Sequence, residues 1–182
     1  MLTTYSTNRL ELRILPAIYS KNILEFYNRN KDFLEPLEPE RSPNFYSETY
    51  QISNLNCEYN AFVKGVYARY WLSEKDAPEK IIGSVCFSDF KKGAFYSCMI
   101  GYKLDQMYCN KGYMSEALIK LIPHACNDFS LHRINAIVMP DNTPSINLLE
   151  KLNFIREGYL HSCAQINGKW KDHLLYSYIN PE

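Results

Sequence analysis

Apolar and polar residues alternate in several short segments of the chain, and this period of two is typical of half-buried β-strands. In Arg9–Ile14, for example, Leu10, Leu12 and Ile14 fall on one face. The strands predicted in this way are Arg9–Ile14, Val66–Leu72, Lys80–Phe87, the segment from the Lys91–Gly93 turn to Leu104, and Arg133–Met139. The last of them is apolar on both faces, which indicates a strand that is covered on both sides.

Between the strands, apolar residues recur at the three- and four-residue steps of a helix. The helices predicted are Ser20–Asn30, one that is capped by Ser47 and runs to about Val63, a central helix after Gly112, and Ser145–Leu152. In the second helix, Ile52, Leu55, Tyr59 and Phe62 should form the buried face, and Gly65 should end it.

Prolines limit two of the helical segments. The prolines between Lys31 and Pro43 leave room only for a single helical turn near Phe33-Leu34, because a proline breaks the hydrogen-bond ladder of a helix. Pro123 lies inside the central helix. We expect a kink there rather than an end, because the apolar residues after it keep the helical spacing.

The C-terminal segment predicts a hairpin of two strands, Phe154–Ile166 and Lys169–Ile179, joined by the tight-turn pair Asn167-Gly168. Helices thus lie between strands in the middle of the chain, whereas hairpins supply the rest. This order predicts a mixed α/β sheet. We expect one domain over residues 1–182, since no linker or internal repeat is visible and the length suits a single core.

Charge and composition narrow the range of partners. Twenty basic and 20 acidic residues cancel, and no basic run stands out, which argues against a nucleic-acid binder held by overall charge. The six cysteines form no C-x-x-C pair and the four histidines no H-E-x-x-H pattern, so no metal site is predicted. Without a signal-peptide core or an apolar run near the ~20 residues of a membrane span, we expect a cytoplasmic protein with free thiols and no membrane contact.

The stretch Tyr102–Ile122 carries the clearest candidate chemistry, because it predicts the end of a strand, a polar turn with one glycine, and the start of a helix. The first turn of a helix has unpaired N–H groups at the positive end of the helix dipole, which suits a phosphate. Gly112 would let the backbone approach such a ligand closely, and Lys111 adds a cation. The alternative is an ordinary helix start with a glycine in its turn.

Short motifs follow one another in a fixed order along nearly the whole chain. They are Thr7–Arg13, Ile100–Tyr102, Lys111–Leu118, Asp141–Ser145, Leu152–Phe154, Glu157-Gly158, and Asn167–Trp170 before Asp172. In this order they resemble the GNAT (general N-acetyltransferase) superfamily, and within it the branch of ribosomal-protein N-terminal acetyltransferases that modify alanine or serine. The resemblance implies a mixed, mostly antiparallel sheet of about seven strands flanked by helices. It also implies that acetyl-coenzyme A is the cosubstrate and that a primary amine accepts the acetyl group.

In that family the diphosphate loop follows the pattern Q/R-x-x-G-x-G/A, which falls here on Cys109–Met114. Gly112 fits the pattern, whereas Cys109 replaces the polar first residue and Met114 the small last one. Binding survives both changes, because backbone N–H groups supply most of the contact to phosphate. The residues that the resemblance assigns to the cofactor here are Asn110, Lys111, Gly112, Tyr113, Met114 and Ser115.

By the same resemblance, the cofactor lies in a V-shaped opening between the fourth and fifth predicted strands. Its pantetheine arm would pair with the backbone of the fourth strand like an added strand, at Lys103, Leu104 and Asp105. The alternative is that these three residues only close the strand.

Asn142 and Ser145 match the family's N-x-x-S at the second cofactor helix. The resemblance implies that Asn142 contacts the cofactor and that Ser145 donates a proton to the leaving thiolate. Many relatives carry a tyrosine for this proton where this chain has Leu149, which leaves Ser145 as the nearest substitute. The alternative is structural, with Asn142 in an Asx-type turn and Ser145 as the cap of the helix.

The reaction implied is direct attack of a neutral amine on the thioester. A weak base suffices, because an α-amino group has a pKa of about 8. The candidate bases, which are equally well surface carboxylates, are Glu40, Glu48, Glu58 and Asp89. Tyr102 would line the acceptor side or belong to the core. No covalent acyl-enzyme is predicted, because Cys109 has no histidine near it in the sequence.

The leading acceptor is a protein N-terminal α-amine. Two other readings stay open: a small amine such as a polyamine, an amino acid or an aminoglycoside, and a non-catalytic coenzyme A sensor, which the departures at Cys109 and Leu149 allow. Acceptor choice is expected to depend on Lys31–Phe62 and on the final hairpin. Either a monomer or a homodimer is compatible with the sequence.

Overall fold

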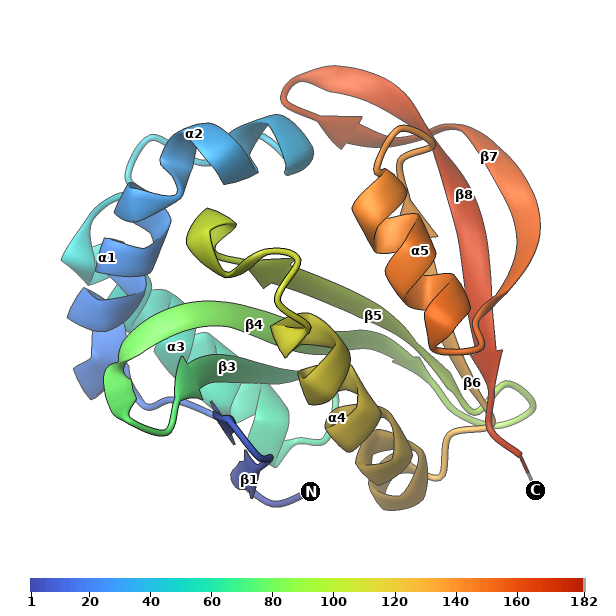
Figure 1. The fold of residues 1–182 in the computed structure, drawn as a ribbon, viewed down its shortest axis with the longest axis horizontal. Coiled ribbons are helices and arrows are strands. Elements are labelled where there is room, and N and C mark those ends of the chain that lie inside the picture. Colours follow the sequence, from blue (N-terminus) through green and yellow to red (C-terminus); the bar gives the residue numbers. More distant parts are fainter. Residues whose placement is uncertain (182) are drawn as a thin grey trace.

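One mixed sheet runs through the whole computed structural model, which describes residues 1–181 (Figure 1). The strands are β1 (Thr4–Ser6), β2 (Leu10–Arg13), β3 (Ala68–Glu74), β4 (Ala77–Lys91), β5 (Ser97–Leu104), β6 (Arg133–Val138), β7 (Ile155–Ile166) and β8 (Lys169–Ile179). Their order is β1-β2-β3-β4-β5-β6-β8-β7, and every neighbouring pair is antiparallel except β5 and β6. The predicted α/β fold with a mostly antiparallel sheet is confirmed. The sheet has 8 strands rather than about seven, because the 3-residue edge strand β1 is too short to show a period in the sequence.

Helices cover the two faces of this sheet. They are α1 (Ser20–Arg29), α2 (Lys31–Leu34), α3 (Glu48–Val63), α4 (Tyr113–Phe129) and α5 (Thr143–Lys151), with 3-10 turns η1 (Ala17–Tyr19), η2 (Glu35–Leu37) and η3 (Gln106–Tyr108). Helices α4 and α5 lie on one face, and α1 and α3 lie on the other (Figure 1). Within residues 1–181, no helix combines the length and the apolar character that crossing a bilayer requires.

Several local predictions are confirmed. The Ser47 hydroxyl accepts a hydrogen bond from the Tyr50 N–H at 3.2 Å and so caps α3. Pro123 lies inside α4, which continues to Phe129 instead of ending at the proline, while the kink expected there stays a prediction. The hairpin turn has φ +45° at Asn167 and +72° at Gly168, the left-handed pair that a tight two-residue turn between strands requires.

The buried face of α3 differs from the prediction. Ile52 and Tyr59 are 38% and 43% exposed, whereas Gln51 and Leu55 are buried. Gln51 can be buried because its side-chain amide donates to the Phe45 carbonyl at 2.7 Å. The buried face of α3 is therefore rotated from the predicted one, because Gln51 is buried and Ile52 is exposed.

Strand β6 is also less covered than predicted. Its residue Ile137 is 37% exposed, although Ile134, Ala136 and Val138 are buried. The helices on that face make their main contacts with other strands, α1 with β4 and α3 with β3.

The parallel pair β5–β6 is the feature of the sheet that positions the site. The two strands pair only from Ser97 to Met99 on β5. Beyond Met99, β5 continues with β4 as its only partner, while β6 continues beside β8. The two strands thus part and leave two unpaired edges that face one another. The faces of β5 follow the predicted alternation, with Cys98 and Ile100 buried toward α4.

Asp105 follows the last residue of β5 and begins the loop that leads to α4. Its side chain is 1% exposed, and its carboxylate accepts hydrogen bonds from Arg29 Nε at 2.7 Å and from the Met107 N–H at 2.9 Å. Burial by itself would raise the pKa of Asp105, but these hydrogen bonds outweigh it and hold the pKa below its ordinary value.

We expect Asp105→Asn to lower the free energy of unfolding at pH 7 by about 2 kcal/mol, because a charge-assisted hydrogen bond to Arg29 is lost. The folded-state pKa is lowered, so this stabilisation is present above the unfolded-state pKa of roughly 4 and disappears as the pH falls through the folded-state value. Urea unfolding of the wild type and of Asp105→Asn between pH 7 and pH 3 measures this stabilisation. The difference between the two free energies of unfolding should become smaller as the pH falls. A difference that stays constant would contradict the stabilising role of the ionised Asp105 carboxylate.

Candidate active site

The start of α4 presents a run of backbone N–H groups that have no acceptor among residues 1–181. It comprises residues Asn110–Ser115, and the first hydrogen bond of the helix runs from the Glu116 N–H to the Gly112 carbonyl at 3.0 Å. Gly112 is the N-cap, with φ +80° and no side-chain cap, and Asn110 also has a positive φ of +60°. An uncapped helix start that follows left-handed residues gathers N–H groups in one concavity, which is an arrangement that binds phosphate.

The side chains of this loop explain how it tolerates its departures from the family pattern. Met114 lies in the first turn of α4 with its side chain buried in the core. Its larger side chain therefore does not enter the space in front of the loop. The Cys109 thiol donates a weak hydrogen bond to the Asp105 carbonyl at 3.5 Å, and burial raises the pKa of Cys109. Cys109 is therefore a protonated thiol rather than an activated nucleophile.

The three residues predicted for the pantetheine arm differ in their surroundings. Lys103 and Leu104 lie on the edge of β5 that faces β6 but does not pair with it. The Lys103 ammonium forms an ion pair with the Glu38 carboxylate. Asp105 is different, because its N–H already donates to the Ile82 carbonyl at 2.7 Å. Hydrogen-bonded pairs alternate along an antiparallel ladder, so the backbone groups of Lys103, paired with Ser84, also point to β4, and those of Leu104 are left to face β6.

Ser145 and Tyr102 meet across the opening between the two strands. The Ser145 Oγ lies 2.6 Å from the Tyr102 hydroxyl, and either atom can donate. Burial raises the pKa of Tyr102 to about 12, which the hydrogen bond to Ser145 partly offsets, so both hydroxyls are protonated near neutral pH. Tyr102 is thus part of the site as well as of the core, and only the tertiary structure shows its partner.

Asn142 is the N-cap of α5. Its side-chain oxygen accepts a hydrogen bond from the Ser145 N–H at 3.2 Å, which is the structural role that the sequence left open for it. Ser145 does not cap the helix, since its hydroxyl is directed to Tyr102 instead. Leu149, at the position where relatives carry a tyrosine, is buried in the core. A tyrosine hydroxyl nevertheless lies at the start of α5, where β5 supplies it.

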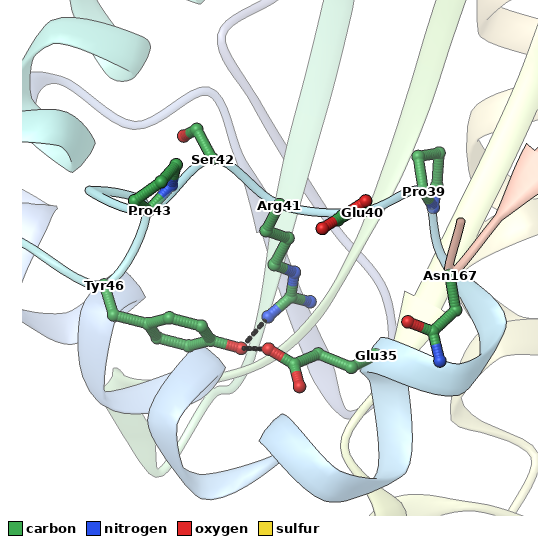
Figure 2. Close-up of a pocket in the computed structure, with 8 residues that line it drawn as sticks. All are labelled: Glu35, Pro39, Glu40, Arg41, Ser42, Pro43, Tyr46 and Asn167. Atoms are coloured by element: carbon green, nitrogen blue, oxygen red, sulfur yellow. Dashed lines mark hydrogen bonds between the residues drawn. The ribbon is translucent and has the colours of Figure 1, made fainter.

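A cavity of about 310 Å³ opens between the segment that follows α2 and the tip of the β7–β8 hairpin (Figure 2). Its lining residues are Glu35, Pro39, Glu40, Arg41, Ser42, Pro43, Tyr46 and Asn167. Figure 2 shows the Arg41 guanidinium and the Glu35 carboxylate directed to the same Tyr46 hydroxyl, which donates to Glu35 at 2.7 Å. The cavity therefore combines the two segments from which acceptor choice was expected.

Glu38 connects this cavity to β5. Its carboxylate pairs with Lys103 and with Arg41 Nη2, the latter at 2.6 Å, and its carbonyl accepts from the Asn167 N–H at 3.0 Å. Burial would raise the pKa of Glu38, but the two cations outweigh it and keep the pKa below its ordinary value. Since Lys103 follows Tyr102 directly, this contact joins the cavity to the strand that carries the Tyr102–Ser145 pair.

The four candidate bases lie in different places. Glu58 forms an ion pair with Arg69 at 2.9 Å and is not a solvated carboxylate. Glu48 begins α3, and Asp89 is exposed near the far end of β4. Glu40 is the one of the four that lines the cavity. No group of His, Cys, Asp or Glu side chains in residues 1–181 is arranged to hold a metal ion.

Arg9 is a residue at the site to which the sequence analysis assigned no role. It precedes β2, and its guanidinium donates to the Lys111 carbonyl at 3.0 Å. The only signal for it was its place in the Thr7–Arg13 motif. Nothing in the spacing of residues 9 and 111 predicts that they touch.

Comparison with known proteins places the chain in a family. Residues 10–155 match the family described as acetyltransferase (GNAT) domain. The [ribosomal protein uS5]-alanine N-acetyltransferase of Escherichia coli is 33% identical over 97% of this chain and 91% of its own length. The probable N-acetyltransferase YjcK of Bacillus subtilis is 30% identical over 94% of each chain.

Solved structures agree with this result. The ribosomal-protein-S5-alanine acetyltransferase of Vibrio fischeri superposes with a TM-score of 0.93 and 30% identity, covering 98% of this chain and 97% of that one. The Mycobacterium smegmatis RimJ structure, in complex with a coenzyme A disulfide, has a TM-score of 0.89 at 23% identity over 97% of this chain and 86% of that one. At that identity the second likeness concerns the fold alone.

The left-handed backbone of Gly112 leads to a prediction about stability. A side chain at φ +80° is strained, so we expect Gly112→Ala to lower the free energy of unfolding by about 1–2 kcal/mol. Gly101 on β5 offers a matched control, because its φ is not in the left-handed region and an added Cβ would meet nothing within 4 Å. Thermal or urea unfolding should show little change for Gly101→Ala. An equal loss for both variants would show that the backbone conformation at Gly112 is not the cause.

Proposed function

The chain belongs to the GNAT family of acetyltransferases, and on this basis we propose that it transfers an acetyl group from acetyl-coenzyme A to the N-terminal α-amine of a ribosomal protein. The observation that carries the proposal is the likeness to the uS5-alanine N-acetyltransferase of E. coli over nearly the full length of both chains. That match includes the cavity segment and the final hairpin, from which acceptor choice is expected. A ribosomal acceptor would place the enzyme in the cytoplasm.

The start of α4 fits the diphosphate of acetyl-coenzyme A. The free N–H groups of Asn110–Ser115 supply hydrogen bonds and the positive end of a helix dipole, and Lys111 adds a charge. The side-chain oxygen of Asn142 is used by its own helix, whereas no acceptor among residues 1–181 binds its NH2 group. Asn142 can therefore donate to an amide carbonyl of the pantetheine arm.

The free edge of β5 fits the pantetheine arm itself. The backbone N–H and carbonyl of Leu104 face the opening, whereas those of Lys103 point to Ser84 on β4, so a polyamide arm that adds there as a short strand would pair with Leu104. Asp105 is excluded from this pairing by its bond to Ile82 and instead holds the end of the strand in place. The thioester at the end of such an arm would then lie in the opening that Tyr102 and Ser145 bridge.

In the chemical step, a neutral amine attacks the thioester carbonyl and the thiolate of coenzyme A leaves. Ser145 is the proposed acid, which passes its hydroxyl proton to the leaving sulfur and takes a proton from the Tyr102 hydroxyl 2.6 Å away. Tyr102 is protonated at neutral pH and so has a proton to give, and its raised pKa favours prompt return of a proton to it. The proton that the amine loses restores the pair.

The cavity beside β5 is the proposed entry for the acceptor. Glu40 lines it on the solvent side, and the Glu38–Lys103 contact connects it to the strand next to Tyr102. A peptide N-terminus that enters there approaches the thioester from the side of the sheet opposite to α4. Glu40 is accordingly the carboxylate best placed among the four candidates to accept the proton of the incoming ammonium, directly or through water.

Release of free thiol from acetyl-coenzyme A tests the proposed function. The panel should contain peptides that begin with alanine or serine, the same peptides with a blocked N-terminus, and spermidine, free amino acids and an aminoglycoside. We expect turnover with the unblocked peptides, and mass spectrometry should place the acetyl group on the α-amine. Faster turnover of the small amines would move the assignment to them. Binding of coenzyme A without turnover of any acceptor would indicate a sensor.

The role of Ser145 can be separated from binding. We expect Ser145→Ala to lower kcat by about 10²-fold, the usual contribution of a general acid, with little change in the Kd for acetyl-coenzyme A. Tyr102→Phe should lower kcat as well if the proton passes along the pair. Steady-state kinetics and calorimetry measure the two quantities. A fully active Ser145→Ala protein with an unchanged melting temperature would remove the acid role.

A further inference from the structure

Arg9 reaches the loop before α4 from the turn between β1 and β2. Its Nη1 donates to the Lys111 carbonyl at 3.0 Å, and its guanidinium lies over the Tyr113 ring at 4.1 Å from the ring centroid. Its Nη2 lies 3.5 Å from the point that a Cβ on Gly112 would occupy. Arg9 therefore contacts Lys111 and Tyr113 and lies beside Gly112, within the segment whose N–H groups are free.

The contact with Lys111 determines where one of those N–H groups points. The Lys111 carbonyl and the Gly112 N–H belong to the same planar trans peptide, in which they point in opposite directions. By holding the carbonyl toward itself, Arg9 turns the Gly112 N–H to the opposite side of the peptide. Without this hydrogen bond, a loop with left-handed residues at Asn110 and Gly112 is free to rotate that peptide.

Arg9 also neutralises a charge that would oppose an anion at this place. Glu116 lies in the first turn of α4, and its carboxylate accepts from the Arg9 N–H at 2.9 Å, Arg9 Nε at 2.7 Å and the Thr7 hydroxyl at 2.5 Å. Burial would raise the pKa of Glu116, but these hydrogen bonds keep it below its ordinary value, so the group is ionised at neutral pH. An unpaired carboxylate here would repel a diphosphate bound at the same helix start.

We propose that Arg9 is a positioning residue for the acetyl donor: it presents the Gly112 N–H to the diphosphate and cancels the charge of Glu116. Arg9 thereby sets the preference for a coenzyme A thioester over a thioester that lacks the diphosphate. The inference rests on the proposed function, since it concerns the same donor site.

The test compares acetyl-coenzyme A with S-acetylpantetheine, which carries the same thioester but no diphosphate. We expect Arg9→Ala to raise the KM for acetyl-coenzyme A by about tenfold, the size of one charge-assisted hydrogen bond, and to leave the KM for S-acetylpantetheine unchanged. Arg133→Ala is a matched control, because Arg133 forms a similar partly exposed pair with Glu157 at 2.6 Å at the closed end of β5 and β6. Arg133→Ala should leave the KM for S-acetylpantetheine divided by the KM for acetyl-coenzyme A as in the wild type.

Arg9→Lys tests the geometry, and it serves if the alanine variant does not fold. Lysine carries its donors on one nitrogen and does not reproduce the separate Nε and Nη1 bonds to Glu116 and the Lys111 carbonyl. The KM for S-acetylpantetheine divided by the KM for acetyl-coenzyme A should therefore fall, as for Arg9→Ala. Equal KM changes for both thioesters, or full recovery by lysine, would overturn the positioning role. A wild-type protein that does not distinguish the two thioesters would overturn the donor site and this inference together. A wild-type preference that Arg9→Ala leaves intact would overturn the inference alone.

Discussion

The parting of β5 and β6 is the constraint on which the rest of the structure depends. The two strands pair over a few residues and then follow different neighbours, β4 and β8. Unpaired strand edges inside a protein are costly unless something bonds to them or covers them. Here the contacts that span the region are side-chain pairs, Tyr102 with Ser145 and Lys103 with Glu38. They connect β5 to α5 and, through the Glu38 carbonyl that accepts from the Asn167 N–H, to the β7–β8 hairpin, without closing the edges.

The two helices that begin beside this opening differ in how the N–H groups of their first turns are bonded. At the start of α5, Asn142 bonds the Ser145 N–H, and Pro144 has no N–H to satisfy. At the start of α4, Gly112 offers no side chain, and the N–H groups from Asn110 onward have no acceptor among residues 1–181. Helix starts with free N–H groups are stabilised when an anion binds them. This contrast within one protein is what supports the proposed binding of the diphosphate at the open end of α4.

The departures from the family pattern become intelligible once the packing is known. Met114 is accommodated because its side chain is part of the core, and Cys109 contributes a weak bond to Asp105 rather than a reactive thiolate. Leu149 fills the core at the place of the family tyrosine. The hydroxyl beside Ser145 comes instead from Tyr102 on the neighbouring strand, so the same kind of group is held near the start of α5 by a different element.

The sequence by itself determined what depends on near neighbours: the alternation of β5, the Ser47 cap, the turn at Asn167-Gly168, and the glycine that opens α4. Only the tertiary structure decided which face of α3 is buried, because the Gln51 amide needs the Phe45 carbonyl as its partner. It also decided that Ser145 meets Tyr102 and that Arg9 meets Lys111, pairs separated by 43 and 102 residues. Local patterns follow from helix and strand periods, whereas such pairs exist only because the sheet brings distant segments together.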